Sequence, residues 1–468
     1  MPTCYRCQEY GTSCKYKSPR PLVVSLESVP PRAHSSHLEL VPIQPRPQMQ
    51  LTSGPSSVFL SDEVEGRYFR LFQEKLAFDL SGYSGSTFWI QMIPQQCHHD
   101  PGIKHAITAL SALYKSAISS KTHTIDLADE HVRYALLKQS KAISSLRQTL
   151  SCRKPQLRLA LVASLLFSCF ESFHGDWQTA TQQIYSGFSI LKNLTEGKGQ
   201  HVKNDLIDID LEVSRILHNL ELQILAFFAM NPMSDHPFND LVIKSTLPVV
   251  PERFLTLNEA FAVATDLVAS VLRHSRTAAR CGDDPESHEW TVQQQQYLQE
   301  VVRQWNVAYE PFFLKARNIT NREQLNIHHV RICLWTCEII IVTSMSYNEI
   351  VFDIFTAQFE TINHYARQLL QKDQGIRRLD GMRLQYGMGL IMVLFYTATR
   401  CRVLSVRRGA ISLLREWPCT NGIWHSLQAA KVAELIAGIE ETGCETLGII
   451  PESRRRSYKD STFGIDSH

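Results

Sequence analysis

The chain has 468 residues, of which 44% are hydrophobic and 20% charged, and its formal net charge is only +2. This balance is typical of a folded globular protein, and the length allows about three domains of ordinary size. The composition excludes a chain that is disordered throughout and one that is basic throughout, so any nucleic-acid binding must depend on a local basic segment.

The first 20 residues combine closely spaced cysteines with cations: Cys4, Cys7, Cys14, Lys15, Lys17 and Arg20. Two thiolates in a Cys-x2-Cys turn can share one Zn²⁺, and a third cysteine six residues later can act as a further ligand. The neighbouring cations would lower the thiol pKa and favour contact with phosphate. One structural zinc needs four ligands, so three thiols do not complete such a site, and three incidental thiols remain the alternative interpretation.

A proline- and serine-rich stretch follows, with prolines at Pro19, Pro21, Pro30, Pro31, Pro42, Pro45, Pro47 and Pro55. Proline lacks an amide donor and fixes φ, so this stretch predicts an extended linker. We therefore divide the chain into a cysteine-containing element at 1–20, a linker at 21–58, a body at 59–446 and a disordered polar tail at 447–468.

The sequence shows neither a secretory signal nor an obvious membrane span. Its longest apolar stretch, Leu384 to Thr399, is shorter than the ~20 residues that cross a bilayer. Most of the 12 cysteines lie singly among apolar neighbours, as Cys169, Cys333 and Cys401 do. Such cysteines are typical of reduced core thiols. We expect a soluble intracellular protein with no membrane partner.

Apolar residues recur at helical spacing throughout the body, and no alternating strand pattern of consequence is present. Ser61 is the predicted N-cap of the first helix, and Asp100-Pro101 predicts the cap and first residue of the next. A nearly all-apolar segment, 156–173, predicts a buried central helix. Further helices are expected at 125–150, 176–194, 208–230, 257–278, 291–316, 322–347, 351–372, 380–399, 402–416 and 423–441. The predicted fold class is all-α, a large irregular helical bundle or solenoid-like domain.

No catalytic constellation is visible. The sequence has no G-x-S-x-G, no H-E-x-x-H and no glycine-rich phosphate loop. The consecutive histidines of Cys97-His98-His99-Asp100 cannot easily face one metal, and His328 and His329 point ~100° apart in a helix. We therefore predict that the protein is not an enzyme.

The stretch from Pro2 to Tyr16 resembles the second half of a fungal Zn₂Cys₆ binuclear cluster, a family in which two Cys-x2-Cys-x6-Cys halves hold two zincs. The resemblance implies that Cys4, Cys7 and Cys14 are cluster ligands. The basic segment from Lys15 to Arg20 is expected, from its charge, to contact phosphates. The first half of the motif, with its base-reading basic helix, is missing from the sequence. Three of six ligands therefore carry over, and no base-reading residue does.

The body, over residues 64–446, is similar to the fungal-specific transcription factor domain, which implies a helical regulatory fold. The similarity depends on the order and spacing of several segments: Asp100–Tyr114, Tyr134–Ile143, Leu165–Glu171, Gly175–Trp177, Ser186–Gly187, Tyr396–Arg402, Arg407–Ile411, Gly422–Trp424 and Glu440–Glu441. We interpret Gly175 and Gly187 as positions of a helix end or a close helix approach. Trp177 and Trp424 are predicted packing anchors, and Glu171 a capping or buried-pair carboxylate.

By resemblance, we expect a nuclear fungal transcription factor that regulates RNA polymerase II genes, such as a metabolic or secondary-metabolite cluster. Zinc is the expected cofactor. The expected partners are DNA (once the missing half is supplied), a second copy of the chain, co-regulators or a small-molecule inducer. The alternative is a regulator without DNA binding that acts through protein partners or as a metabolite-sensing helical module. The tail residues Arg454-Arg455-Arg456 are interpreted as a localisation patch or as part of a solvated tail.

Overall fold

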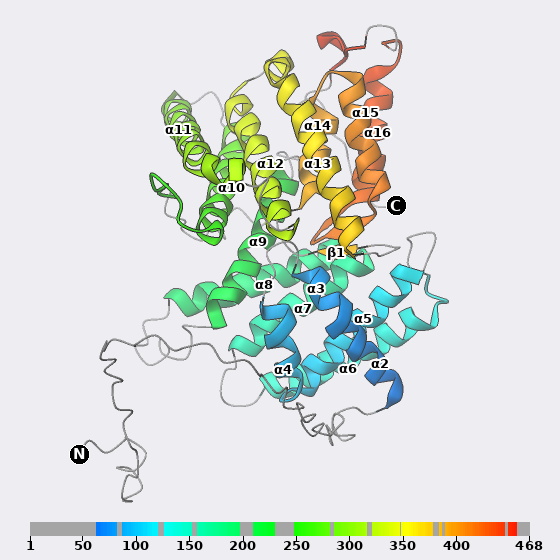
Figure 1. The fold of residues 1–468 in the computed structure, drawn as a ribbon. Coiled ribbons are helices and arrows are strands. Elements are labelled where there is room, and N and C mark those ends of the chain that lie inside the picture. Colours follow the sequence, from blue (N-terminus) through cyan, green and yellow to red (C-terminus); the bar gives the residue numbers. More distant parts are fainter. Residues whose placement is uncertain are drawn as a thin grey trace, which may run out of the picture. The chain divides into compact units, whose positions relative to one another are not determined.

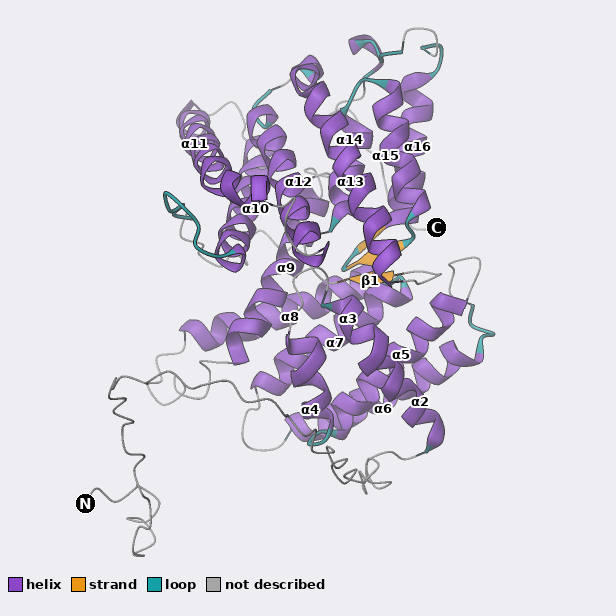
Figure 2. Ribbon diagram, in the orientation of Figure 1, coloured by secondary structure: helices purple, strands orange, loops and turns teal. Residues whose placement is uncertain are grey.

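The computed structural model describes residues 62–81, 87–119, 126–151, 157–196, 209–229, 248–280, 285–315, 321–346, 348–377, 383–385, 389–444 and 448–455. All of them belong to one compact unit, residues 56–468. Within these ranges the structure is almost entirely helical (Figure 2), so the predicted all-α fold class is confirmed. The predicted boundaries at 20 and 58 lie outside the described residues.

The helices form two groups in chain order. The first group contains α2 (Glu63–Leu71), η1 (Phe72–Leu76), α3 (Ala77–Leu80), η2 (Phe88–Met92), α4 (Ile93–Cys97), α5 (Pro101–Ser119), α6 (Glu130–Leu150), α7 (Leu157–His174) and α8 (Trp177–Glu196). The helix α9 (Ile209–Ala229) follows. The second group contains α10 (Leu257–Arg280), α11 (Pro285–Lys315), α12 (Asn321–Thr343), η5 (Glu349–Phe355), α13 (Thr356–Arg377), α14 (Leu390–Arg400), α15 (Leu404–Glu416), α16 (Ser426–Glu441) and η6 (Glu452–Arg454). Figure 1 draws α9 between the two groups.

Each group encloses its own hydrophobic core, here called the N-terminal core and the C-terminal core. The helix α9 contributes to both. Leu217 and Ile224 belong to the N-terminal core, whereas Leu222 and Ala226 belong to the C-terminal core. Buried residues therefore lie on several sides of α9, which is the pattern of a helix enclosed on all sides.

The predicted central helix is confirmed, because α7 is buried nearly all round. Among the described residues, α7 and the Gln324–Thr343 part of α12 are long and apolar enough to cross a membrane, which the expectation from uninterrupted apolar stretches missed. In the structure 67% of the first segment and 72% of the second are buried, as in helices that pack at the centre of a fold.

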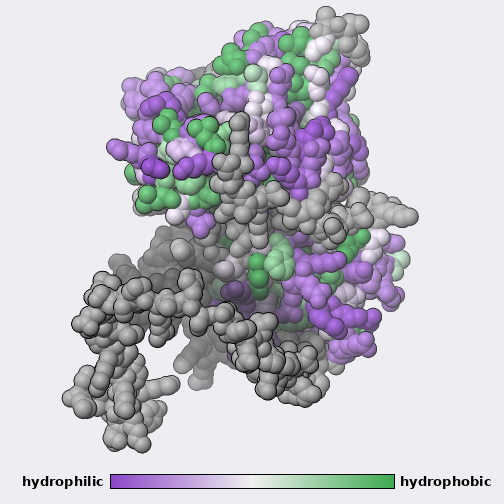
Figure 3. Space-filling view, viewed as in Figure 1, coloured by the Kyte–Doolittle hydropathy of each residue, from purple (hydrophilic) through white to green (hydrophobic). Residues whose placement is uncertain are grey.

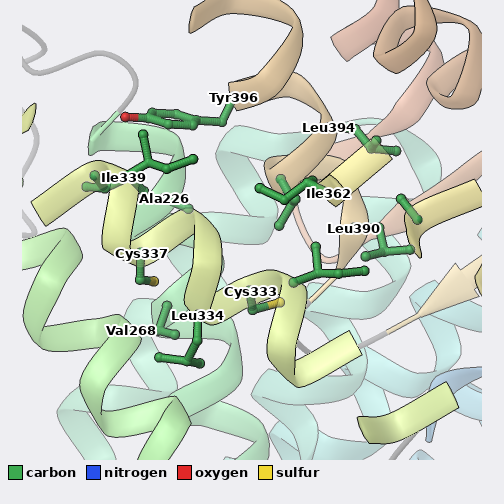
Figure 4. Packing of buried hydrophobic residues seen from close by; sticks show 14 of the residues in the cluster. Ala226, Val268, Cys333, Leu334, Cys337, Ile339, Ile362, Leu390, Leu394 and Tyr396 are labelled. Atoms are coloured by element: carbon green, nitrogen blue, oxygen red, sulfur yellow. The ribbon is translucent and has the colours of Figure 1, made fainter. Parts of the chain in front are cut away.

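The cysteines of the two cores are buried thiols, as predicted for Cys169, Cys333 and Cys401. Figure 4 shows Cys333 and Cys337 on α12 within the C-terminal core, with Val268 of α10 and Leu390 of α14 also in view. Burial raises the pKa of Cys333 to about 12. These thiols therefore stay protonated and act as small apolar side chains.

Of the two N-cap residues predicted from the sequence, one is confirmed and the other is wrong. Asp100 accepts hydrogen bonds from the amides of Gly102 (2.7 Å) and Ile103 (3.1 Å), so it caps α5 as predicted. The predicted cap at Ser61 is wrong. Asp62 directly precedes α2, and its carboxylate accepts from the Glu65 amide at 2.6 Å. Both residue types cap helices well, so the pattern alone did not decide between neighbours.

A small sheet corrects two helix predictions. The segment expected to be helical from 380 contains β1 (Arg383–Gln385), and α14 begins only at Leu390. β1 pairs in parallel with β2 (Cys419–Asn421), which pairs antiparallel with β3 (Trp424–His425). Gly422, at φ +54°, forms the turn between β2 and β3. The helix expected from 423 therefore begins at Ser426.

The prediction of a disordered tail is wrong for residues 448–455. Ile449 forms a β-bridge with Val403, and the Ile450 amide donates to the Arg402 carbonyl at 2.9 Å. Arg455, expected in a localisation patch or a solvated tail, is buried with its side chain 1% exposed. Sequence polarity did not reveal this because the arginine is buried by charge pairing rather than by apolar contact.

His218 links α9 to α10 by charge. Its Nδ1 lies 3.0 Å from Glu221 Oε2 and its Nε2 lies 3.1 Å from Asp266 Oδ1. Burial alone would lower the pKa of His218, but the hydrogen bonds and charge of Asp266 and Glu221 raise it to about 9. The folded protein therefore keeps a proton on His218 that the unfolded chain loses near its usual pKa of 6.5.

We expect the stabilisation by His218 to be complete below pH 6.5 and lost as the pH rises towards 9, because the folded-state pKa is raised. The loss should reach up to about 3 kcal/mol. It is measured by urea unfolding of the wild-type chain and of His218→Gln at both pH values. The variant should lose less stability than the wild type over this interval. Equal losses in both proteins would contradict the assignment.

Candidate functional site

Two predicted sets of site residues lie outside the described residues: the zinc ligands Cys4, Cys7 and Cys14, and the phosphate contacts Lys15, Lys17 and Arg20. Within the described ranges, no group of three or more His, Cys, Asp or Glu side chains is arranged to hold a metal ion. In the Cys97–Asp100 motif, Cys97 is buried and Asp100 caps α5. The described residues therefore offer candidates of a different kind.

A cleft of about 590 Å³ lies between α11 and α12. The two helices run antiparallel. Gln295, early in α11, donates to the carbonyl of Ile341, late in α12, and Tyr309, late in α11, donates to the carbonyl of Ile327, early in α12. The cleft is lined by Gln299, Val302, Arg303, Asn306, Val307, Glu310, Arg331, Glu338, Ile341 and Val342. Its volume lies within the range of small-molecule sites.

The cleft combines an apolar floor with a charged rim. Val302 and Ile341 are buried and belong to the C-terminal core. Val307 remains exposed at the edge, although it is apolar. On the face drawn in Figure 3, hydrophobic residues are interspersed among polar ones. A ligand in the cleft would thus bury apolar surface and meet several charges.

Arg331 makes both polar and aromatic contacts at the cleft. Its Nη1 donates to Asn306 Oδ1 at 3.0 Å and its Nη2 to Glu310 Oε2 at 2.9 Å. The guanidinium carbon lies 5.3 Å from the ring centroids of both Phe313 and Trp335. Burial lowers the pKa of Arg331, although the group remains a cation at neutral pH. Its Nε is buried and has no hydrogen-bond partner among the described residues, so this cation is not fully satisfied.

Glu338 lies on the same helix, two turns after Arg331. Its Oε2 accepts from Gln358 Nε2 at 3.1 Å. No basic side chain in the described part of the chain forms an ion pair with it. Arg303, on the opposite rim, is held by Glu300 through hydrogen bonds of 2.8 and 2.6 Å. Glu338 therefore has an amide rather than a cation as its hydrogen-bond partner, and its charge acts on Arg331, where it offsets part of the lowering of the pKa by burial.

A second charged cluster, the arginine–glutamate network, anchors the C-terminal segment. Arg455 Nη2 lies 2.9 Å from Glu349 Oε2, and its Nη1 lies 3.3 Å from Glu440 Oε2. Arg407 Nη1 pairs with the same Glu440 oxygen at 2.6 Å, and both of these side chains are at most 1% exposed. The network connects η5, α15, α16 and the segment 448–455. Its cations and carboxylates face one another, so we assign it a structural role.

Most residues of the family-like segments are structural, as interpreted. Gly175 has φ +98° and ends α7, and a Cβ on Gly187 would lie 2.7 Å from Ser164 Oγ of α7. Trp177 and Trp424 both lie 5.6 Å from Phe227 between ring centroids. These packing roles are confirmed.

Glu171 takes neither of its two predicted roles. Its side chain forms no hydrogen bond or ion pair with another described residue, whereas its backbone carbonyl accepts from the Gly175 and Asp176 amides. Burial, with a smaller effect of Asp176, raises the pKa of Glu171 to about 7.

Sequence reasoning missed the cleft and the network. The cleft residues are spread over two helices and form no motif. One signal in the sequence was available: Arg331 lies among apolar residues of α12. A charge in such a segment needs polar partners from another element, because burying an unpaired charge is costly. The network residues were noticed only as matches to a family pattern, without their pairing.

Residues 67–185 match the profile described as "Fungal specific transcription factor domain". The chain is also 24% identical over 324 residues to the aspercryptin biosynthesis cluster-specific transcription regulator of Emericella nidulans; the alignment covers 66% of this chain and 51% of that protein. The chain thus spans about half the length of this curated relative. No solved structure matches. The chain is therefore similar to fungal transcription regulators, most specifically over residues 67–185.

Proposed function

We propose that the chain regulates transcription in a fungus, in the nucleus, and acts on RNA polymerase II genes of a biosynthetic cluster. The match of residues 67–185 to the fungal transcription factor profile carries this proposal. The matched residues include the end of α2, all of η1, α3, η2, α4, α5, α6 and α7, and the first part of α8. Together these elements build most of the N-terminal core. The relative in Emericella nidulans supports the finer statement about a gene cluster.

A tethering experiment tests the regulatory role without assuming a DNA site. The full chain is fused to a bacterial DNA-binding domain and expressed in a fungal cell with a matching reporter gene. We expect reporter transcription to rise or fall relative to the DNA-binding domain alone. An unchanged reporter, with the fusion abundant and in the nucleus, would overturn the proposal.

Zinc binding by Cys4, Cys7 and Cys14 is part of the same proposal, with Lys15, Lys17 and Arg20 as phosphate contacts. We expect the purified chain to hold zinc and the triple variant Cys4→Ser/Cys7→Ser/Cys14→Ser to hold none, because thiolate ligands are removed. Metal content is measured by mass spectrometry. The buried Cys333→Ser is the control and should keep the zinc. Equal zinc in the triple variant would show that these cysteines are not the ligands.

A second function is a regulator that does not bind DNA itself and works through partner proteins, a second copy of the chain or a sensed metabolite. The cleft between α11 and α12 favours the metabolite-sensing form, because it joins an apolar floor to incompletely paired charges. A chain without zinc that still changes the tethered reporter would support this second function.

A further inference from the structure

The helix α11 carries a row of exposed apolar side chains, here called the α11 stripe: Trp290, Tyr297, Val307 and Leu314. Each of them is between 44% and 68% exposed. Among the described elements α11 packs mainly on α10 and α12, and Figure 1 draws it at the outer edge of the second group of helices. The stripe extends over about 36 Å of helix. Apolar surface of this kind on an outer helix is a candidate contact surface.

The spacing along the stripe is that of a helix that pairs with another helix. The exposed positions that connect its members are 290, 293, 297, 300, 304, 307 and 314, with the partly buried Pro311 before the last. Steps of three and four residues in alternation are typical of a coiled-coil seam. Leu298, Val301 and Trp305 belong to the C-terminal core. The helix therefore has one face for its own core and a second face suited to a partner helix.

The stripe is symmetric about the middle of the helix. Tyr297 and Val307 lie five residues before and after Val302, and Trp290 and Leu314 lie twelve residues before and after it. In an antiparallel pair of identical helices, residues at equal steps on either side of a two-fold axis lie at the same level. A second α11 would thus bring its Val307 opposite Tyr297 and its Leu314 opposite Trp290, in four apolar layers.

The charges of α11 also favour an antiparallel copy of itself. Residues 285–300 contain three glutamates and no lysine or arginine, whereas residues 301–315 contain Arg303, Lys315 and only Glu310 as an acid. Glu310 pairs with Arg331 of α12. An antiparallel pair lays the acidic half of each helix along the basic half of the other, which a parallel pair would not do.

The centre of such a pair is polar and electrically neutral. Glu300 pairs with Arg303 and accepts from Gln304 Nε2 at 3.0 Å. Glu300 and Gln304 lie two residues before and after Val302, so each would face the other residue of the second copy. Polar residues within a helix seam fix the register of the two helices. The central layers would therefore select the same register as the apolar ones.

Pro311 adds a further group that a second copy could use. Proline has no amide hydrogen, so the Val307 carbonyl lacks the donor that the residue four positions later normally supplies. The partner's Tyr297 would lie at the level of this carbonyl and carries a hydroxyl donor at the end of its ring.

We propose that two copies of the chain associate through the α11 stripe, with the helices antiparallel about a two-fold axis at the level of Val302. This inference goes beyond the proposed transcriptional function, because it assigns a surface for self-association that is measured on the purified chain. A monomeric chain that still changes the tethered reporter would contradict the pairing alone, and a dimeric chain with no effect on the reporter would contradict the proposed function alone.

Sedimentation equilibrium of the full chain tests the surface. We expect a dimer with a dissociation constant in the micromolar range. Tyr297→Lys and Val307→Glu should each weaken it at least about tenfold, because each places a charge against an apolar side chain. Leu435→Glu changes a residue of α16 that is also exposed and apolar, so it is the control and should keep the dimer. Circular dichroism verifies that the variants fold.

Mixing the two variants tests the register. A chain with Tyr297→Lys and a chain with Val307→Glu form one native layer and one lysine–glutamate layer, so the mixture should recover the dimer that neither variant forms alone. Tyr297→Lys mixed with Leu314→Glu has the same charges at unmatched levels and should stay monomeric. Trp290→Lys mixed with Leu314→Glu is a second matched pair and replaces the first if one of its members does not fold.

Three results would overturn the proposal. The wild-type chain stays monomeric at tens of micromolar, Tyr297→Lys and Val307→Glu dimerise as the wild type does, or the matched mixture recovers no more dimer than the unmatched one. The third result would leave a contact on α11 but exclude the antiparallel register about Val302.

Discussion

Replacing Arg407 with methionine is expected to lower the free energy of unfolding by about 3 kcal/mol. The Arg407 side chain is fully buried, donates to Glu440 Oε2 at 2.6 Å and to the Ala398 carbonyl at 2.8 Å. Methionine fills a similar volume but leaves the buried carboxylate without its nearest cation. Arg455 still lies 3.3 Å from Glu440, which places the expected loss at the lower end of the range for a broken buried pair.

Urea denaturation measures this change, and an exposed pair supplies the control. Arg415 pairs with Glu434 on the surface of α15 and α16, so Arg415→Met should change the stability by less than about 1 kcal/mol. Similar effects at Arg407 and Arg415 would contradict the role given to the network.

Replacing Gly389 with alanine is expected to lower the free energy of unfolding by about 2 kcal/mol. A Cβ at this position would lie 1.4 Å from Asn421 Nδ2, so the Asn421 side chain must move. The Oδ1 of Asn421 accepts a buried hydrogen bond of 2.9 Å from Gln223 Nε2, which connects α9 to β2. If Asn421 moves, this hydrogen bond breaks, and the buried amide groups of Gln223 and Asn421 must find other hydrogen-bond partners.

Gly438→Ala is the matched control for this substitution. Gly438 lies in α16, and a Cβ there would meet no atom within 4 Å. Alanine is favoured over glycine in a helix by about 0.5–1 kcal/mol, so this variant should be slightly more stable than the wild type. A Gly389→Ala chain that gains stability in the same way would show that Asn421 is free to move.

The sequence allowed the helices to be predicted because their apolar residues recur over many turns. The buried helix α7 and the Asp100 cap of α5 depend on neighbours within a few residues, so they could be predicted locally. By contrast, β1 has three residues and depends on pairing with β2, far along the chain. Arg455 depends on carboxylates from η5 and α16, which no local pattern links to it.

The candidate cleft was less predictable than the fold. In the sequence, Arg331 and Glu338 look like ordinary charged residues of one helix. Their place in a cleft becomes visible only when α11 is packed against α12. The predicted metal and phosphate residues belong to the first 20 positions, where the sequence alone supports the interpretation. A site formed by a contiguous sequence motif can be predicted in this way. A site whose residues come from two helices can be recognised only after the fold is known.

The placement of α9 has a consequence for how the chain can be divided. The segment that matches the transcription factor profile stops at residue 185, inside α8 and before α9. A fragment cut there would lack Leu217, Leu220 and Ile224, which fill the N-terminal core, and would expose that interior to water. A fragment that starts after α9 would lack Leu222 and Leu225 of the other core. Neither half is autonomous, so a truncation that preserves one of them has to include α9 in full.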